Sequence, residues 1–322
     1  MINKYLKTLL NGGVPEREAR PLEDGLAAFE AGRHLEALPL LEEAVTAQPQ
    51  QFEALVALGR IHLAANDLEA ARRRFLEALT LENRSAPLFY DLGEVSFRAR
   101  QPADAIRFFQ RAIAVDPDHT DAHIRLGMVH QEAGRLPEAT KAFERAIFLD
   151  RCAVVARFHL AQVCIAAGDT RRALTQLHLV KELHGDYAPV YVLQGELQLG
   201  LGDFRQAVVE FEQAIELGAD DVAVHWSLSE ACARLGEHDK ALKAALRALD
   251  HDPDHLPAHL RAAELLERMR RYPQAQRHYE ALFGMEGFDQ AAREGLERVA
   301  GVLAEIATTM AGEAGPGAEP KA

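Results

Sequence analysis

Small and apolar residues recur along this chain with a period of 34 positions. In the stretch from Ala86 to His119, apolar residues form two runs at helical spacing, with Leu92-Gly93 in the first and Ala105 and Phe109 in the second. Apolar residues three and four positions apart share one face of a helix, so each period predicts two helices joined by a turn. The period continues without insertion to Asp289. It gives eight copies, which start at Glu18, Phe52, Ala86, Thr120, Val154, Ala188, Val222 and Leu256.

Two positions of each copy hold small residues, and a third holds a larger one. The twentieth position is Ala in every copy and the eighth is Gly, Ala or Ser, which lets two helices approach closely. We expect the side chain at position 24 to fill the gap between them. That position holds Leu41, Phe75, Phe109, Phe143, Leu177, Phe211, Ala245 and Tyr279. Ala245 fills the gap least, so a softer joint is expected in the seventh copy.

This pattern resembles the tetratricopeptide repeat, with Leu-Gly, then Ala-x3-Phe, then Pro at set offsets of a 34-residue unit. Glycines mark the turn inside five copies: Gly32, Gly134, Gly168, Gly202 and Gly236. The resemblance implies an all-α fold, a right-handed α-solenoid superhelix of helix-turn-helix repeats. It also implies that the first helices line a concave groove, and that the chain is a non-catalytic adaptor or assembly factor that binds other proteins.

Four segments follow from this register. Residues 18–289 form the eight repeats, 290–311 a C-terminal helix that covers the last repeat, and 312–322 a disordered tail. Residues 1–17 form an N-terminal amphipathic segment, in which Ile2 to Leu10 carry apolar residues at helical spacing opposite Lys4 and Lys7. Two interpretations of it stay open: it caps the first repeat, or it docks on another molecule.

The resemblance places positions 5, 9 and 12 of each first helix on the concave side. Position 5 is apolar in all eight copies, including Leu22, and position 9 becomes acidic toward the C-terminus. The candidate partner-binding residues are Val56, Arg60, Tyr90, Glu94, Phe97, Ile124, Met128, Phe158, Gln162, Val192, Glu196, Trp226, Glu230, Leu260 and Glu264. Apolar anchors beside glutamates favour an amphipathic partner segment with basic residues. Some residues at position 5 have an alternative role as core between repeats.

The charge balance narrows the class of partner. Lys plus Arg number 36 against 49 Asp plus Glu, a net charge of −13, which argues against nucleic acid and anionic membranes. No apolar run reaches the roughly 20 residues of a membrane span. The N-terminus is too polar for a secretory signal. Three scattered cysteines indicate a reducing cytoplasm. The excess of Arg over Lys, 29 to seven, is a weak indication of a bacterial source.

No catalytic or phosphate-binding motif is present, so no cofactor is expected. Two histidine pairs at a spacing of four are weak candidates for a metal site: His119 and His123, and His255 and His259. Both pairs lie in turns between repeats, where the Asp-Pro-Asp sequence ends one helix and caps the next. Three functional hypotheses remain. The adaptor is the first, a scaffold that self-assembles as a homo-oligomer is the second, and a metal-binding or enzyme-accessory protein is a minor third.

Overall fold

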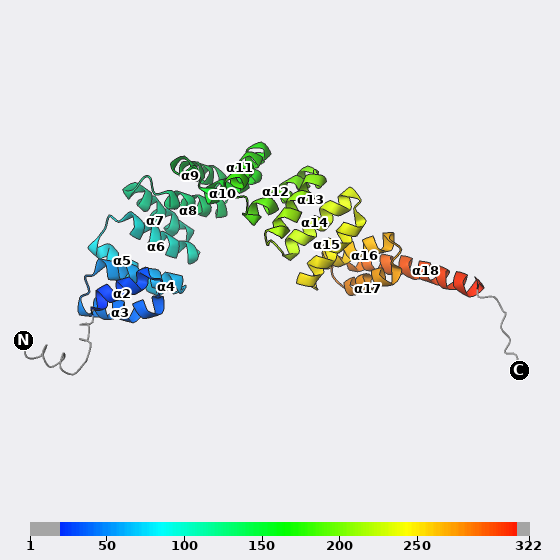
Figure 1. Cartoon of the computed structure of the whole chain (residues 1–322), viewed down its shortest axis with the longest axis horizontal. Coiled ribbons are helices and arrows are strands. Elements are labelled where there is room, and N and C mark those ends of the chain that lie inside the picture. Colours follow the sequence, from blue (N-terminus) through cyan, green and yellow to red (C-terminus); the bar gives the residue numbers. More distant parts are fainter. Residues whose placement is uncertain (1–19, 314–322) are drawn as a thin grey trace, which may run out of the picture. The chain divides into compact units, whose positions relative to one another are not determined.

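The computed structural model describes residues 20–313, which form seventeen helices and no strand. The chain divides into two units, Met1–Val163 and Cys164–Ala322. Figure 1 shows the helices following one another in antiparallel pairs within each unit. The fold is an all-α solenoid of helix-turn-helix repeats, as the sequence predicts. The segment 1–17 and the residues 314–322 of the expected tail lie outside the described residues.

The first helices of the repeats begin where the 34-residue period places them. From the second repeat onward they start at Phe52, Ala86, Thr120, Val154, Ala188, Val222 and Leu256. The first unit holds α2 (Pro21–Glu30), α3 (His34–Ala47), α4 (Phe52–Ala64), α5 (Leu68–Leu81), α6 (Ala86–Arg98), α7 (Pro102–Val115), α8 (Thr120–Glu132) and α9 (Leu136–Leu149). Helix α10 (Val154–Ala166) crosses the boundary. The second unit holds α11 (Thr170–Leu183), α12 (Ala188–Leu201), α13 (Phe204–Glu216), α14 (Val222–Leu235), α15 (His238–His251), α16 (Leu256–Arg268), α17 (Tyr272–Leu282) and α18 (Asp289–Glu313).

Glycine at position 8 meets phenylalanine at position 24 in four of the repeats. A Cβ atom built on Gly93 would lie 2.4 Å from Cε1 of Phe109, and one on Gly59 would lie 2.4 Å from Cε1 of Phe75. All four of these rings are fully buried. The missing Cβ is therefore what allows the ring to lie directly against the first helix, as the small residue predicts.

The turn inside every repeat passes through the left-handed region at position 15. Five repeats have glycine there, for example Gly134 at φ 69°. The other three have Asn66, Arg100 and Arg270, at φ 59°, 57° and 58°. Because the left-handed conformation strains a residue with a Cβ, Arg100 and Arg270 show that repeat geometry overrides local preference at these turns.

In the seventh repeat, which has no aromatic ring at position 24, a hydrogen bond connects the two helices. Its position 8 is Ser229, which is fully buried and donates a hydrogen bond of 2.8 Å to the carbonyl oxygen of Ala241 on the second helix. Ala245 is also fully buried. The serine thus links the two helices directly where other repeats insert an aromatic side chain. The expected softer joint at this repeat stays a prediction.

Helix α18 packs on α17 and α16 and ends two residues inside the expected tail. Gly295 faces the ring of Tyr279, whose Cε1 would lie 2.4 Å from an added Cβ. Arg298 binds Glu267 of α16 with two bonds of 2.9 and 3.1 Å, and the Tyr279 hydroxyl donates to the same carboxylate at 2.8 Å. This bidentate contact attaches α18 to the last repeat.

The Arg298→Ala variant is expected to lower the free energy of unfolding by about 1 kcal/mol at neutral pH, since the pair is partly exposed and screened. The hydrogen bonds from Arg298, and then that from Tyr279, hold the pKa of Glu267 below its usual value. A carboxyl group whose pKa is lower in the folded state stabilises the fold at pH values above its unfolded-state pKa. That stabilisation is lost as the pH falls through the folded-state pKa. The difference between variant and wild type should therefore shrink below about pH 4. Urea unfolding at several pH values measures it. The Arg247→Ala variant, which removes an exposed pair within α15, should change little at any pH.

Candidate functional site

The apolar row at position 5 is neither fully buried nor fully exposed. All eight of its side chains are partly buried, in both units. In the first unit they are Leu22, Val56, Tyr90, Ile124 and Phe158, and in the second Val192, Trp226 and Leu260. Leu22 and Val56 pack against buried core residues of the first unit, and Val192 and Leu260 against those of the second. Partial burial is compatible with both expectations for this row, and the lining of a groove stays a prediction.

The side chain of Tyr90 already makes several contacts within the first unit. Its ring stacks on His119 with centroids 5.1 Å apart and lies 5.7 Å from Phe109. Burial raises the pKa of the Tyr90 hydroxyl, while a hydrogen bond with Arg125 opposes the rise. Only part of the ring is left to contact a partner.

The charged residues of the first unit pair across neighbouring repeats. Arg60 donates from Nε to Oδ2 of Asp91 at 2.8 Å, and Nε of Arg125 lies 2.8 Å from Oε1 of Glu94 as an ion pair. Glu94 and Asp91 are each only 6% exposed, and burial raises the pKa of both, against the neighbouring guanidinium groups. Little of the Glu94 side chain is therefore left at the surface to contact a partner, and its place in a groove stays an untested prediction. Its carboxylate is drawn into the contact between repeats by Arg125.

The remaining candidates of the first unit are neutral. Arg125 reaches the sulfur of Met128 at 3.8 Å and lies over the ring of Phe97 at 5.9 Å. Gln162 accepts a hydrogen bond of 3.0 Å from Gln131 of the preceding repeat. Phe97 also borders a hollow of about 200 Å³, which it shares with Arg100, Pro102, Val129, Glu132 and Ala133. This face carries no free carboxylate at position 9.

Trp226 is the central aromatic residue of the second unit. Its ring lies 5.6 Å from that of His255 and under the guanidinium of Arg261, 5.7 Å from the ring centroid. Val192 and Leu260 occupy the same position in the repeats on either side. Trp226 is the only tryptophan of the chain, so its fluorescence reports on this surface alone.

The glutamates of the second unit differ from one another. Glu230 forms ion pairs with Arg261 and Arg234 and is partly buried. Glu196 and Glu264 are exposed, and within residues 20–313 neither of them forms an ion pair. Partial burial, and then the nearby Asp221, raise the pKa of Glu196. The unpaired negative charge on this face thus belongs to Glu196 and Glu264.

Sequence reasoning missed the partners that neutralise position 9. They stand at position 6 of the following repeat, 31 residues later: Asp91 for Arg60, Arg125 for Glu94 and Arg261 for Glu230. The signal was available, because opposite charges recur at this fixed spacing. Position 9 alone suggests a charged groove, whereas positions 9 and 6 together indicate a ladder between repeats.

The four histidines proposed as weak metal candidates have structural roles. His119 and His255 cap their helices, since Nδ1 of each accepts a hydrogen bond from the backbone N–H of the third residue of the following helix, at 3.3 and 3.2 Å. Nε2 of His123 bonds the carbonyl oxygen of Pro117, and Nε2 of His259 that of Pro253. The two rings of each pair therefore do not direct their nitrogen atoms at one common point.

None of the helices within residues 20–313 is both long enough and apolar enough to cross a membrane. Cys164 and Cys232 are buried and Cys152 is exposed, and none of the three forms a disulfide bond within residues 20–313. Burial raises the pKa of the Cys232 thiol to about 11, so it stays protonated at neutral pH.

Comparisons with known proteins agree with this architecture. Among solved structures, that of pilF from Pseudomonas aeruginosa superposes with a TM-score of 0.57 at 19% identity, over 66% of this chain and 95% of that one. The type IV pilus biogenesis factor PilW gives 0.55 at 19% identity, over 60% and 90%. The Cut9–Hcn1 structure gives 0.55 at 16% identity, over 87% and 55%. At these identities the likeness shows the fold alone. No curated protein matches the sequence.

The fold and its recurring helix-pair geometry define a helical-repeat protein. Models described as tetratricopeptide repeat match residues 28–92, 90–153, 154–178 and 192–255. The chain belongs to the tetratricopeptide repeat family. Repeats of this family generally act as non-catalytic interaction modules.

Proposed function

We propose that this protein is an adaptor whose first helices in the second unit hold a basic, amphipathic segment of a partner protein. The anchors are Val192, Trp226 and Leu260. Glu196 and Glu264 contact the cationic residues of the segment. A single aromatic anchor with aliphatic neighbours and a charged border is the usual arrangement of an interface hot spot.

The observation that carries this proposal is the unpaired charge. In the first unit, Arg60 and Glu94 are both neutralised by the next repeat. In the second unit, Glu196 and Glu264 stay exposed beside an apolar row. An exposed carboxylate gains most from a partner cation that has no competitor in the same chain, so the partner contact is expected here.

A self-assembling scaffold is the second candidate function. The observation that favours it is the sequence from Ile2 to Leu10, in which an apolar face stands beside Lys4 and Lys7. This segment has the chemistry expected of the partner. Its binding to the second unit of a neighbouring copy would be a head-to-tail contact, which builds open filaments or rings.

The test uses a labelled peptide with the sequence of residues 1–13, titrated into the full-length protein while Trp226 fluorescence and peptide anisotropy are recorded. Saturable binding with a change in Trp226 emission is expected. The Trp226→Ala variant should bind about 30-fold more weakly, which corresponds to about 2 kcal/mol. The pair Glu196→Lys and Glu264→Lys should slow association and reduce its dependence on salt.

The matched control carries Glu216→Lys and Asp239→Lys, which change the net charge equally but lie on the second helices α13 and α15. It should bind like the wild type. If both double variants weakened peptide binding equally, the effect would depend on net charge alone, and this result would contradict the proposed site. Mass photometry of the full-length protein then separates the two functions, because a strict monomer at all concentrations excludes the scaffold.

A further inference from the structure

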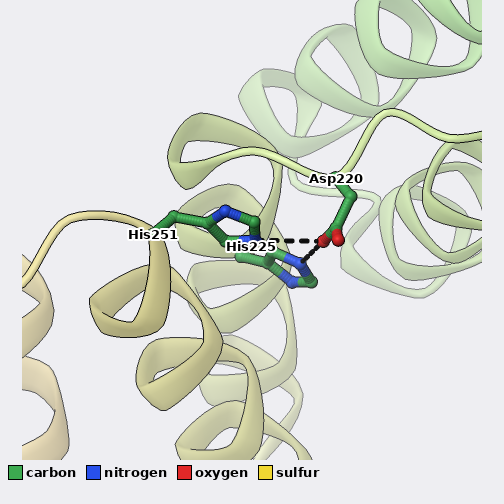
Figure 2. A group of neighbouring side chains, drawn as sticks. All are labelled: Asp220, His225 and His251. Atoms are coloured by element: carbon green, nitrogen blue, oxygen red, sulfur yellow. Dashed lines mark hydrogen bonds and ion pairs between the residues drawn. The ribbon is translucent and has the colours of Figure 1, made fainter.

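Three side chains converge at the turn that joins the sixth and seventh repeats. Asp220 lies in the turn between α13 and α14, His225 in the first turns of α14, and His251 at the last residue of α15. Figure 2 shows the two imidazole rings stacked, with one nitrogen atom of each directed at the carboxylate of Asp220. All three elements belong to the second unit.

The donor atoms lie close together. Oδ1 of Asp220 is 2.5 Å from Nε2 of His225 and 3.2 Å from Nε2 of His251. The ring centroids are 5.6 Å apart and the rings are inclined by 19°. One nitrogen or oxygen atom from each residue can be chosen so that all lie within 4.8 Å of one another. Nδ1 of His225 is buried and finds no hydrogen-bond partner among residues 20–313, so the hydrogen bond of that ring within this range is the one to Asp220.

His251 departs from the rule of its own repeat position. The corresponding residue is apolar in every other copy: Ala47, Leu81, Val115, Leu149, Leu183, Leu217 and Met285. That position is the last residue of the second helix in six of the eight repeats. A lone imidazole at this position, facing a second imidazole and a carboxylate, is not required by the repeat architecture.

His225 also differs from its equivalents at position 4. His123 and His259 direct Nε2 at a backbone carbonyl of the Asp-Pro-Asp turn before them. The seventh repeat is preceded by Gly218-Ala219-Asp220 instead, so Nε2 of His225 meets a carboxylate. The histidine at position 4 thus bonds a backbone carbonyl in the fourth and eighth repeats, whereas in the seventh it belongs to a cluster of donor side chains.

We propose that Asp220, His225 and His251 bind a divalent transition-metal ion of the zinc class. Two imidazole nitrogens and one carboxylate oxygen form a donor set that suits zinc with a fourth position open, and that suits calcium and magnesium poorly. Asp221, Asp250 and Asp252 lie next to these donors in the sequence and favour a cation. The open position faces water, because Asp220 is 58% exposed and His251 is 35% exposed.

Only small movements bring the donors to coordination distance. Bonds of about 2.0–2.2 Å in a tetrahedral site separate the donor atoms by about 3.4 Å. The Asp220–His225 contact must therefore open by about 1 Å. Asp220 lies on an exposed turn and can move, whereas His225 is held within α14 with 8% of its side chain exposed. The bound ion would tie the turn to both helices of the seventh repeat.

The test titrates Zn²⁺ into metal-free full-length protein against a chromophoric chelator, and follows the visible absorption of Co²⁺ as a second probe. One bound ion per chain and a zinc-dependent rise in melting temperature are expected. The His251→Gln and Asp220→Asn variants should each weaken Zn²⁺ binding by at least about tenfold, since even residues that only orient a ligand cost that much. Both variants change exposed side chains, so folding is not at risk.

Two matched controls locate the site. His184→Gln removes a histidine that contacts a single aspartate, Asp186, at 3.2 Å. His278→Gln removes an imidazole whose Nδ1 lies 3.0 Å from Nδ1 of His259. Both controls should bind Zn²⁺ like the wild type. Absence of saturable binding to the wild type, or loss of binding in His278→Gln but not in His251→Gln, would overturn the proposal.

Discussion

The Gly93→Ala variant is expected to unfold with a free energy about 3 kcal/mol lower than the wild type, the upper end of what overpacking a core costs. The new methyl group would lie 2.4 Å from Cε1 and 2.6 Å from Cδ1 of Phe109. That ring is fully buried and packed among side chains of the same and the next repeat, such as Val129. It cannot move aside without opening the contact between the repeats.

A second substitution should recover most of this loss. The fifth repeat combines Ala161 with Leu177 at the same two positions, so the chain itself holds a compatible pair. The Gly93→Ala, Phe109→Leu double variant is expected to be more stable than the Gly93→Ala single variant. The effects of substitutions at contacting residues on stability do not add, and the smaller, branched leucine side chain accommodates the methyl group.

Chemical denaturation of the three proteins measures this, with Gly200→Ala as the control. An added Cβ at Gly200 in α12 meets nothing within 4 Å. That change should raise stability by about 0.5–1 kcal/mol, because alanine restricts the unfolded chain more than glycine. If Gly93→Ala were as harmless as Gly200→Ala, the close ring contact would not govern the packing of the repeat.

The repeat period predicts the fold well because one local rule recurs at every step. The start of each first helix from Phe52 to Leu256, the small residue at position 8 and the ring at position 24 all follow from the 34-residue spacing. The left-handed residues Arg100 and Arg270 could not be predicted, since arginine has no preference for that conformation. The surrounding repeat imposes it.

The candidate site was predicted only in part, because its charges depend on pairs of repeats. The face of Trp226 and the exposed state of Glu264 follow from the helical register. The burial of Glu94 does not, since it depends on Arg125, which is 31 residues away and on the next helix pair. A single position read along the array cannot show whether its charge is already compensated.

The donors Asp220, His225 and His251 could not be found by motif spacing. They come from a turn, the start of one helix and the end of another, and no short pattern connects them. The histidine pairs that did fit a motif spacing, such as His119 and His123, turned out to be caps and turn contacts. Spacing within a helix is a weaker signal here than the change of one repeat position from apolar to imidazole.

The second large effect on stability is expected at a buried ion pair. Nζ of Lys181 on α11 lies 2.6 Å from Oε2 of Glu210 on α13, and Glu210 is only 3% exposed. Gln206 donates to the other carboxylate oxygen at 2.8 Å, and Lys181 also reaches Gln194 at 3.2 Å. The pair therefore connects the second helices of two successive repeats with the first helix between them.

The Lys181→Met variant is expected to lose at least about 3 kcal/mol of stability, because it leaves the Glu210 charge buried without its cation. Methionine has an unbranched apolar chain of similar length, although it also removes the cation–π contact of the ammonium group, which lies 4.4 Å from the centroid of the Tyr191 ring. The loss therefore measures the uncompensated charge more than lost packing. Thermal and urea unfolding of the full-length protein give its size.

The Lys181→Met, Glu210→Met double variant separates the charge from the packing. Replacing both partners by apolar residues removes the buried charge, so this variant should be more stable than Lys181→Met. Lys240→Met is the surface control, since that lysine is 59% exposed and pairs with Glu237 within the same helix end. It should change stability little. A Lys181→Met loss no larger than that of Lys240→Met would mean that water reaches Glu210, and that the contact between these repeats does not depend on the ion pair.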